Sequence, residues 1–247
     1  MKSIKFDFYG RFAHFKNPEN NIKIELSYEN IPKTVLLGQL GAILGLRGKQ
    51  QEKELGYLEF WEVLKNIKVA IVPHSHKWNK HIESFNNSTG FANTVNKVPS
   101  NQILRRQVLE NVRWTIFILK DGIEEKYFNE LYKMLSARKS KFPLYLGKNE
   151  FKARLGEVEL VDLEKIDIQK VEKCDSLVLA KFVESIEKEE CEEHFIKDEL
   201  FSRKDYTPIG YNKIGLYQLE KIIFTNSYLK ISNGEFYENE DMILNFY

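Results

Sequence analysis

The stretch SYENIPKTVLLGQLGAILGL, residues 27–46, decides the fold of this chain. Pro32 suits a first helical turn, because no N–H is needed there, and an almost wholly apolar run follows. Gly38, Gly41 and Gly45 recur at helical spacing and share one helix face. Each interior glycine costs about 1 kcal/mol relative to alanine, so we interpret this face as one that packs closely on a sheet. The alternative is a phosphate bound near the helix N-terminus.

Alternating and amphipathic segments surround this helix. Apolar and polar residues alternate over 4–9, which is typical of a half-buried strand, and VRWTIFIL at 112–119 has the strongest strand composition in the chain. We also predict strands at 68–72 and 156–161 and helices at 57–65 and 123–138. The resulting order, strand, helix, strand, strand, helix, strand, is that of the ferredoxin-like fold, which RNA-recognition domains share.

Residues 74–106 interrupt this pattern. They are polar and rich in Asn and Ser, and so long a segment between the elements of a compact domain is usually functional. We predict a long β-hairpin that projects from the fold.

The domain organisation follows from these segments. We predict an α+β chain with a ferredoxin-like domain at 1–163, which carries the hairpin insertion at about 74–110. Strand patterns at 217–224 and 228–231 indicate a smaller β-rich region over 164–247.

The composition places limits on the class of protein. The net charge is only +1, but 138–154 holds six basic residues and one acid, while 184–199 holds eight acids and two lysines. Such blocks indicate two different faces or partners. Cys174 and Cys191 form no CxxC pair, so we expect reduced thiols in a cytoplasmic protein. We find no signal peptide, and the longest apolar run is too short to span a bilayer.

Basic and aromatic residues interleave in several places, which is the combination that holds single-stranded RNA. The segment FPLYLGKNEFKAR at 142–154 is one example, and its alternative interpretation is a turn whose rings face the core. We predict an RNA-binding surface made of these residues: Arg11, Lys16, Lys77, Lys80, Arg105, Arg106, Lys148 and Lys152.

Three histidines lie close together in the polar segment. His74 and His76 have the spacing of a metal pair on a strand, but no further ligand stands at a suitable spacing, so we interpret them as solvated loop residues and predict no metal site. Lys80 and His81 are the only candidates for a metal-independent RNA cleavage site, in which His moves protons and Lys stabilises the phosphorane. Nucleotide-binding loops and nucleophile-elbow motifs are absent from the sequence.

Four segments in order resemble the CRISPR-associated proteins of family five. They are FDFYGRFAHFKNP (6–18), SYENIPKTVLLGQLGAILGL (27–46), RRQVLENVRWTIFI (105–118) and PLYLGKNEFKARLGEV (143–158). The resemblance covers residues 1–163. It implies a ferredoxin-like domain of the RAMP superfamily with a projecting hairpin, called the thumb, at 74–106.

The resemblance also implies a function. It indicates a non-catalytic subunit of a type I Cascade complex in antiviral defence, assigned to subtype I-B, which caps the 5′ handle of crRNA and contacts the backbone and large subunits. It implies no cofactor, membrane or small-molecule substrate. In type I-C systems the family member processes precursor crRNA through Tyr, Lys and His, so Lys80 and His81 would serve in the alternative, an endoribonuclease. A third possibility is a protein-interaction module that docks through 184–199.

Overall fold

The computed structural model describes residues 1–18, 23–49, 56–88, 101–197, 199–240 and 242–247. Its first part contains β1 (Lys2–Ala13), α1 (Lys33–Leu44), α3 (Glu59–Leu64), β2 (Val69–Pro73), β3 (Asn79–Ser88), β4 (Asn101–Leu119), α4 (Glu125–Ser136) and β5 (Arg154–Asp162). Its second part contains β6 (Glu164–Lys165), β7 (Val178–Leu179), β8 (Val183–Glu190), β9 (Ser202–Tyr211), β10 (Tyr217–Thr225), β11 (Ser227–Ile231), β12 (Glu235–Asn239) and β13 (Met242–Phe246). The chain is thus α+β, as predicted.

A central antiparallel sheet organises the first part, with the strand order β2-β4-β1-β5. The alternation predicted for residues 4–9 is confirmed, because Ile4, Phe6 and Phe8 are buried while the residues between them are half-exposed. Phe8 lies opposite Trp114 on one side and Leu155 on the other, so the apolar residues of three strands share one face.

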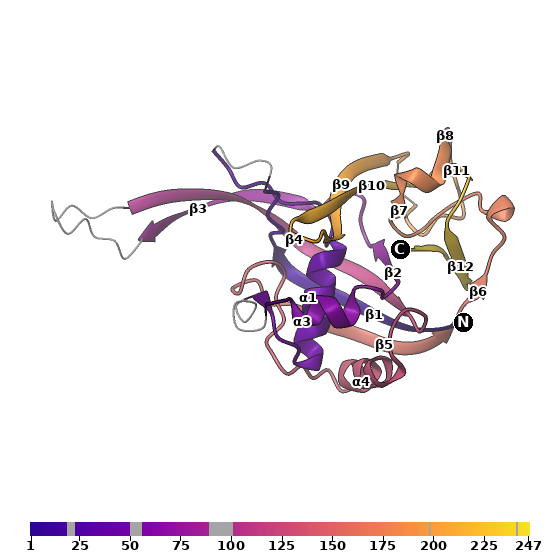
Figure 1. Cartoon of the computed structure of the whole chain (residues 1–247). Helices are drawn as coiled ribbons and strands as arrows, with labels where there is room; N and C mark the ends of the chain where they lie inside the picture. The colour runs from indigo at the N-terminus through magenta and orange to yellow at the C-terminus, as the bar shows by residue number, and fades with distance from the viewer. Residues whose placement is uncertain (19–22, 50–55, 89–100, 198, 241) are drawn as a thin grey trace, which may run out of the picture.

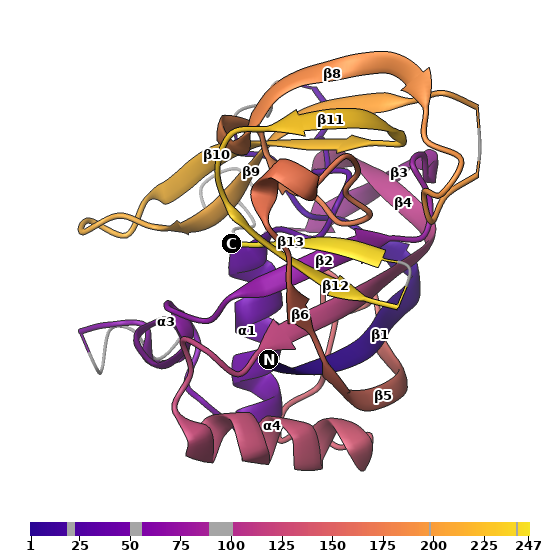
Figure 2. The same ribbon diagram turned by 90° about the vertical axis from the view of Figure 1, so that its right-hand side faces the viewer.

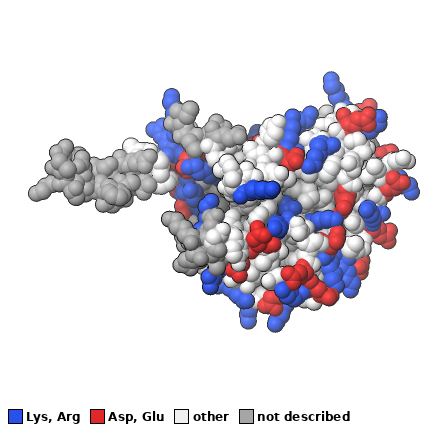
Figure 3. Space-filling model, in the orientation of Figure 1, with Lys and Arg blue, Asp and Glu red and all other residues white. Residues whose placement is uncertain are grey.

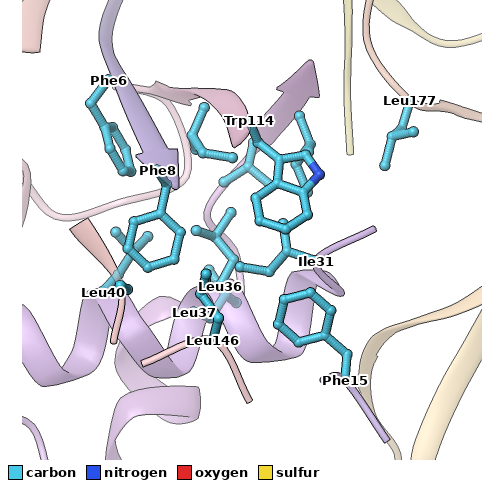
Figure 4. Close-up of a cluster of buried hydrophobic side chains, with 14 of the residues drawn as sticks. Phe6, Phe8, Phe15, Ile31, Leu36, Leu37, Leu40, Trp114, Leu146 and Leu177 are labelled. Atoms are coloured by element: carbon cyan, nitrogen blue, oxygen red, sulfur yellow. The ribbon is translucent and has the colours of Figure 1, made fainter. Parts of the chain in front are cut away.

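Helix α1 packs on this apolar face through Leu36, Leu37 and Leu40, as the close-up in Figure 4 shows beside Phe8 and Trp114. The glycines have another role than the one predicted. A Cβ at Gly41 would come within 2.6 Å of the Cβ of Phe60 in α3, so this glycine admits a neighbouring helix rather than the sheet. Gly45 ends α1 in the left-handed conformation, with φ 78°.

The predicted hairpin is formed by β3 and β4, which pair from Asn79 opposite Glu110 to Ser88 opposite Asn101. Figure 1 shows it projecting from the body of the molecule. Strand β4 begins at Asn101, well before the predicted strand at 112–119, because its first half belongs to the hairpin. The part of the predicted hairpin at 89–100 lies outside the described residues.

The second part is richer in strands than predicted. The strands predicted at 217–224 and 228–231 are confirmed as β10 and β11. The acidic segment also begins as a strand, β8, which pairs with β11. β12 pairs with β6 and β13. Tyr237 of β12 and Leu244 and Phe246 of β13 pack on the face of the central sheet that lies opposite the helices, and Figure 2 shows these two strands in front of β2.

One hydrophobic core joins the two parts. The cluster around Phe8 and Trp114 also includes Leu177, Ile222 and Phe224, which follow position 163. The hydrophobic core therefore continues across position 163, and the domain boundary there stays a prediction. Within the segments that the structure describes, no helix has the length and apolar character needed to cross a membrane. Cys174 and Cys191 are buried and free.

Candidate nucleic-acid interface

The base of the β3–β4 hairpin carries basic side chains from distant parts of the chain. Lys77 is exposed in the turn that leads into β3, and Lys80 is exposed on β3 itself. A pocket of about 440 Å³ beside Lys80 is also lined by Arg203 and Lys204 of β9. We call Lys77, Lys80, Arg203 and Lys204 the hairpin-base surface. Figure 3 shows Lys and Arg side chains where the hairpin leaves the body, with acidic residues among them.

The acidic residues of this region moderate its charge. Lys80 forms an ion pair with Glu29, and Glu29 and Asp205 both line the pocket. The buried ring of Trp78 provides an apolar wall. A pocket of this volume with a few convergent polar groups is of the size that holds a small ligand or a single nucleotide.

Lys80 and His81 lie next to each other on β3, so their side chains project from opposite faces of the hairpin. His81 binds the carboxylate of Glu110 through Nδ1 at 2.6 Å, and its ring packs edge-on against Phe12. Lys80 instead pairs with Glu29. The two side chains are therefore not directed at a common phosphate.

Arg105 and Arg106 are also adjacent on one strand, and they differ in burial. Arg105 is exposed on β4, whereas the side chain of Arg106 is only 6% exposed. Its guanidinium lies 2.7 Å from a carboxylate oxygen of Glu83 on β3 and 2.7 Å from one of Glu150. The rings of Phe85 and Phe151 each lie 4.8 Å from it. Burial lowers the pKa of Arg106, but the hydrogen bonds with Glu150 and Glu83 outweigh it, and the pKa is raised. Arg106 thus joins the hairpin to the loop after α4.

That loop, residues 142–153, is held against the end of β1. The backbone N–H of His14 donates to the carbonyl of Leu146, and Gly147 lies directly against the carbonyl of His14 with φ 84°. A side chain at Gly147 would clash with this carbonyl, so the close approach requires glycine. Of the rings in this segment only Phe151 is buried in the core, whereas Tyr145 is half-buried and Phe142 is 50% exposed, so the interpretation that the rings face inward is confirmed for Phe151 alone.

The remaining predicted cations surround this loop. Lys152 is exposed and lines a pocket of about 560 Å³ together with Arg11, whose guanidinium lies 5.0 Å from the ring of Phe12. Lys16 is exposed and pairs with Glu25. Lys148 is half-buried. Lys77 and Lys80 therefore lie at the hairpin base, Arg11, Lys148 and Lys152 lie in or beside the loop, and Arg106 is buried where hairpin and loop meet.

Electrostatics around the loop favour a neutral histidine. Burial lowers the pKa of His14, whose Nδ1 lies 2.7 Å from the carbonyl oxygen of Gln107. Burial raises the pKa of Glu25, but the hydrogen bond from Lys16 and its charge outweigh this effect, and the pKa lies below its ordinary value. The acid beside Lys16 is thus ionised at neutral pH.

His74 and His76 are not the solvated residues that we predicted. Both are half-buried, His74 within 2.7 Å of the Thr115 hydroxyl and edge-on to Phe195, and His76 stacked on Phe201 with centroids 4.6 Å apart. The rings that cover them come from the second part of the chain, which no local pattern could indicate. In the described part of the chain, no cluster of three or more His, Cys, Asp or Glu residues is suited to a metal ion.

The surface predicted from the sequence left out several basic residues that the fold brings to these sites, although two of them bound the basic block at 138–154. They are Arg113, Arg138, Arg154, Arg203 and Lys204. The only local signal for the last two was the adjacent basic pair in SRKDY, 202–206. Their proximity to Lys80 depends on the packing of β9 near the hairpin base.

Comparisons with known proteins give a family. The chain matches the family model described as CRISPR-associated protein (Cas_Cas5) over residues 3–236. A search of the curated proteins finds no match.

Solved structures with a similar fold are distant in sequence. A CRISPR protein from Archaeoglobus fulgidus is 13% identical, with a TM-score of 0.49, and the match covers 99% of this chain and 98% of that one. A chain titled CRISPR RNA-guided surveillance complex is 13% identical, with a TM-score of 0.50 and coverage of 92% and 91%. A chain of a Type III-B Cmr-beta complex bound to cognate target RNA and AMPPnP is 12% identical, with a TM-score of 0.45 and coverage of 93% and 86%. The surveillance-complex chain, with its TM-score of 0.50, supports the fold alone. The family rests on the family model: because the match extends over residues 3–236, the chain belongs to the CRISPR-associated protein family Cas5.

Proposed function

We propose that this chain is a non-catalytic crRNA-binding subunit of a type I CRISPR Cascade complex. Membership of the Cas5 family over residues 3–236 is the observation that carries the proposal. The strand order β2-β4-β1-β5 with α1 and α4 supports a ferredoxin-like domain. In this interpretation the β3–β4 hairpin is the thumb.

The 5′ handle of the crRNA is the proposed ligand, and the hairpin-base surface is its proposed site. Cations there bind phosphates, and the adjoining pocket of about 440 Å³ admits a base beside Trp78. Arg11, Lys148 and Lys152 extend the positive charge along the loop of 142–153. The proposed partners are the backbone and large subunits of the complex, and subtype I-B and a cytoplasmic location remain part of the proposal.

The absence of catalysis is proposed from the placement of the one Lys-His pair. General acid–base cleavage requires both groups within reach of one phosphate. Lys80 and His81 project from opposite faces of β3, and each is engaged by its own glutamate. This arrangement favours a binding subunit over the endoribonuclease alternative.

Incubation of the purified chain with repeat RNA in EDTA tests the proposal. We expect intact RNA and a mobility shift for RNA that carries the handle, with a weaker shift for a scrambled handle. RNA affinity should fall with salt, and replacing Lys80 and Arg203 with Ser should reduce the slope of log K against log salt by about 0.7 per residue. Lys170→Ser, at an exposed lysine of the second part, is the matched control.

Two results would overturn the proposal. Cleavage in EDTA that His81→Ala abolishes would identify a nuclease. A chain that binds neither handle nor scrambled RNA, and gives no RNA crosslinks, would favour a protein-interaction module that docks through 184–199.

A further inference from the structure

Tyr9 lies in the middle of a row of three residues that crosses the central sheet. On β1 it is directly opposite Arg113 of β4 and Arg154 of β5. Residues directly opposite one another in a sheet project from the same face, with Cβ atoms about 5 Å apart. Because Phe8 projects into the core, Tyr9 and the two arginines project from the face away from α1.

This end of the face is open. The strands β12 and β13 cover the sheet around Val72, Phe117 and Leu119, with which they form a separate buried cluster. At the other end the side chain of Arg113 is 53% exposed, and Arg154 is exposed as well. Tyr9 lines two adjoining pockets, of about 520 and 560 Å³.

The two pockets share Tyr9, Lys152 and Arg154. Arg138, at the end of α4, joins the first pocket, which no carboxylate lines among the described residues. Arg11 and Arg113 join the second, whose only acidic residue in the described part of the chain, Glu150, pairs with Arg106.

The cations around Tyr9 are largely available to a ligand. Arg113 pairs with Asp7. Among the described residues, Arg11, Arg138, Lys152 and Arg154 form no ion pair with a carboxylate. The aromatic ring favours a flat ligand and the surrounding cations favour an anionic one, so the site suits a ligand that is both.

We propose that Tyr9 is a stacking site for one base of single-stranded RNA, and that Arg138, Lys152 and Arg154 bind the phosphates on either side of that base. The inference rests on the proposed function in one respect, because the ligand is the same RNA. The site is separate from the hairpin base, so the RNA contacts the chain at two places.

Single-stranded RNA fits this site better than an acidic protein segment does. The first pocket is lined by Pro143 and Leu144 as well as by the cations. Apolar walls next to an aromatic ring suit a base, which stacks on any π-face, whereas carboxylates need cations alone. The aromatic residue on a sheet face opposite the helices is also the arrangement by which RNA-recognition domains stack bases.

Direct binding measurements on the full chain test the site. Handle-bearing RNA is titrated with Tyr9→Ala, Tyr9→Phe and the double variant Arg138→Ser/Arg154→Ser, with Tyr57→Ala and Lys170→Ser as controls at exposed positions. We expect Tyr9→Ala to weaken binding about tenfold and Tyr9→Phe to keep near-normal affinity, because the ring suffices for stacking. The double variant should reduce the salt slope by about 1.4, and the controls should change neither quantity.

Photocrosslinking with 4-thiouridine gives an independent measurement, which holds even if Tyr9→Ala fails to fold. We expect crosslinks in the peptide that contains Tyr9 as well as in the hairpin base. Crosslinks at the hairpin base alone, or unchanged affinity of the double variant while Lys80→Ser/Arg203→Ser weakens binding, would overturn this site and leave the proposed function standing. Failure of the wild-type chain to bind any RNA would overturn the proposed function itself. Binding of an acidic peptide but not RNA at this face would replace RNA as its ligand.

Discussion

Arg106 connects the β3–β4 hairpin with the loop of 142–153, the two segments that carry most of the predicted RNA-binding residues. Its guanidinium is bound by Glu83 of the hairpin and Glu150 of the following loop, between the rings of Phe85 and Phe151. Removal of one partner from a buried ion pair is strongly destabilising, but both glutamates remain partly solvated. We expect Arg106→Ala to lower the free energy of unfolding by about 2 kcal/mol, measured by urea denaturation.

The neighbouring arginine provides the control for this prediction. Arg105 is exposed on the same strand, so Arg105→Ala should change the free energy of unfolding by less than about 0.5 kcal/mol. Equal effects at the two positions would contradict a structural role for Arg106.

Lys33 is a buried cation at the first turn of α1. Its Nζ donates a hydrogen bond to the carbonyl of Tyr247 at 2.8 Å, and burial lowers its pKa from 10.5 to about 8. Between these two pKa values the unfolded chain holds a proton that the folded chain has released, so stability rises with pH. From pH 7 to pH 9 we expect the free energy of unfolding to rise by about 1 kcal/mol.

Lys33→Met removes the titrating group and keeps much of its volume. Urea midpoints measured at each pH should then lose this rise, and the variant should be the more stable one at pH 7. A pH slope that persists in Lys33→Met would assign the rise to other groups.

At the scale of elements, the contact between α1 and α3 depends on one glycine. A Cβ at Gly41 would meet Phe60 at 2.6 Å, whereas a Cβ at Gly38 would lie 4.0 Å from the same ring. Gly41→Ala should therefore destabilise the fold by about 1 to 3 kcal/mol through overpacking. Gly38→Ala should stabilise it by about 0.5 to 1 kcal/mol, because alanine is the better helix former. Thermal denaturation of both variants checks this, and a shift of the same sign in both would refute it.

Elements with strong short-range periodicity were predictable from sequence. The alternation of β1 and the amphipathic pattern of α4 show which of their residues are buried, because in each pattern the apolar residues recur on a single side. The first half of β4 lacks such a pattern, since Arg105 and Arg106 differ in burial for reasons that lie in β3 and in the loop after α4. Its pairing with β3 therefore had to be inferred from the length of the polar segment alone.

Of the candidate site, only the residues that lie in one continuous segment of the chain were predictable. Lys77 and Lys80 were identified because they lie in an unusual polar stretch. Arg203 and Lys204 reach the same pocket from β9, and Tyr9 meets Arg113 and Arg154 through strand pairing. Contacts of this kind depend on the register between strands that are distant in sequence, and this register cannot be deduced from the periodicity of either strand.

At the scale of the whole molecule, the two parts share a core. Leu177, Ile222 and Phe224 pack in the same cluster as Phe8 and Trp114. We therefore expect a single unfolding transition, in which the calorimetric and van't Hoff enthalpies agree. A fragment of residues 1–163 should lack a cooperative transition by calorimetry. Two separate transitions in the full chain would contradict this expectation.

The cover that β12 and β13 place over the central sheet has a consequence for biosynthesis. Val72, Phe117 and Leu119 are buried beneath Leu244 and Phe246, which leave the ribosome long after them. The face is complete only once Leu119 has been made, and at about 5 to 20 residues per second the interval between residue 119 and residue 242 lasts roughly 6 to 25 s. Throughout that time the nascent chain exposes an apolar sheet face with no cover of its own, a surface that chaperones bind and that promotes aggregation of truncated products.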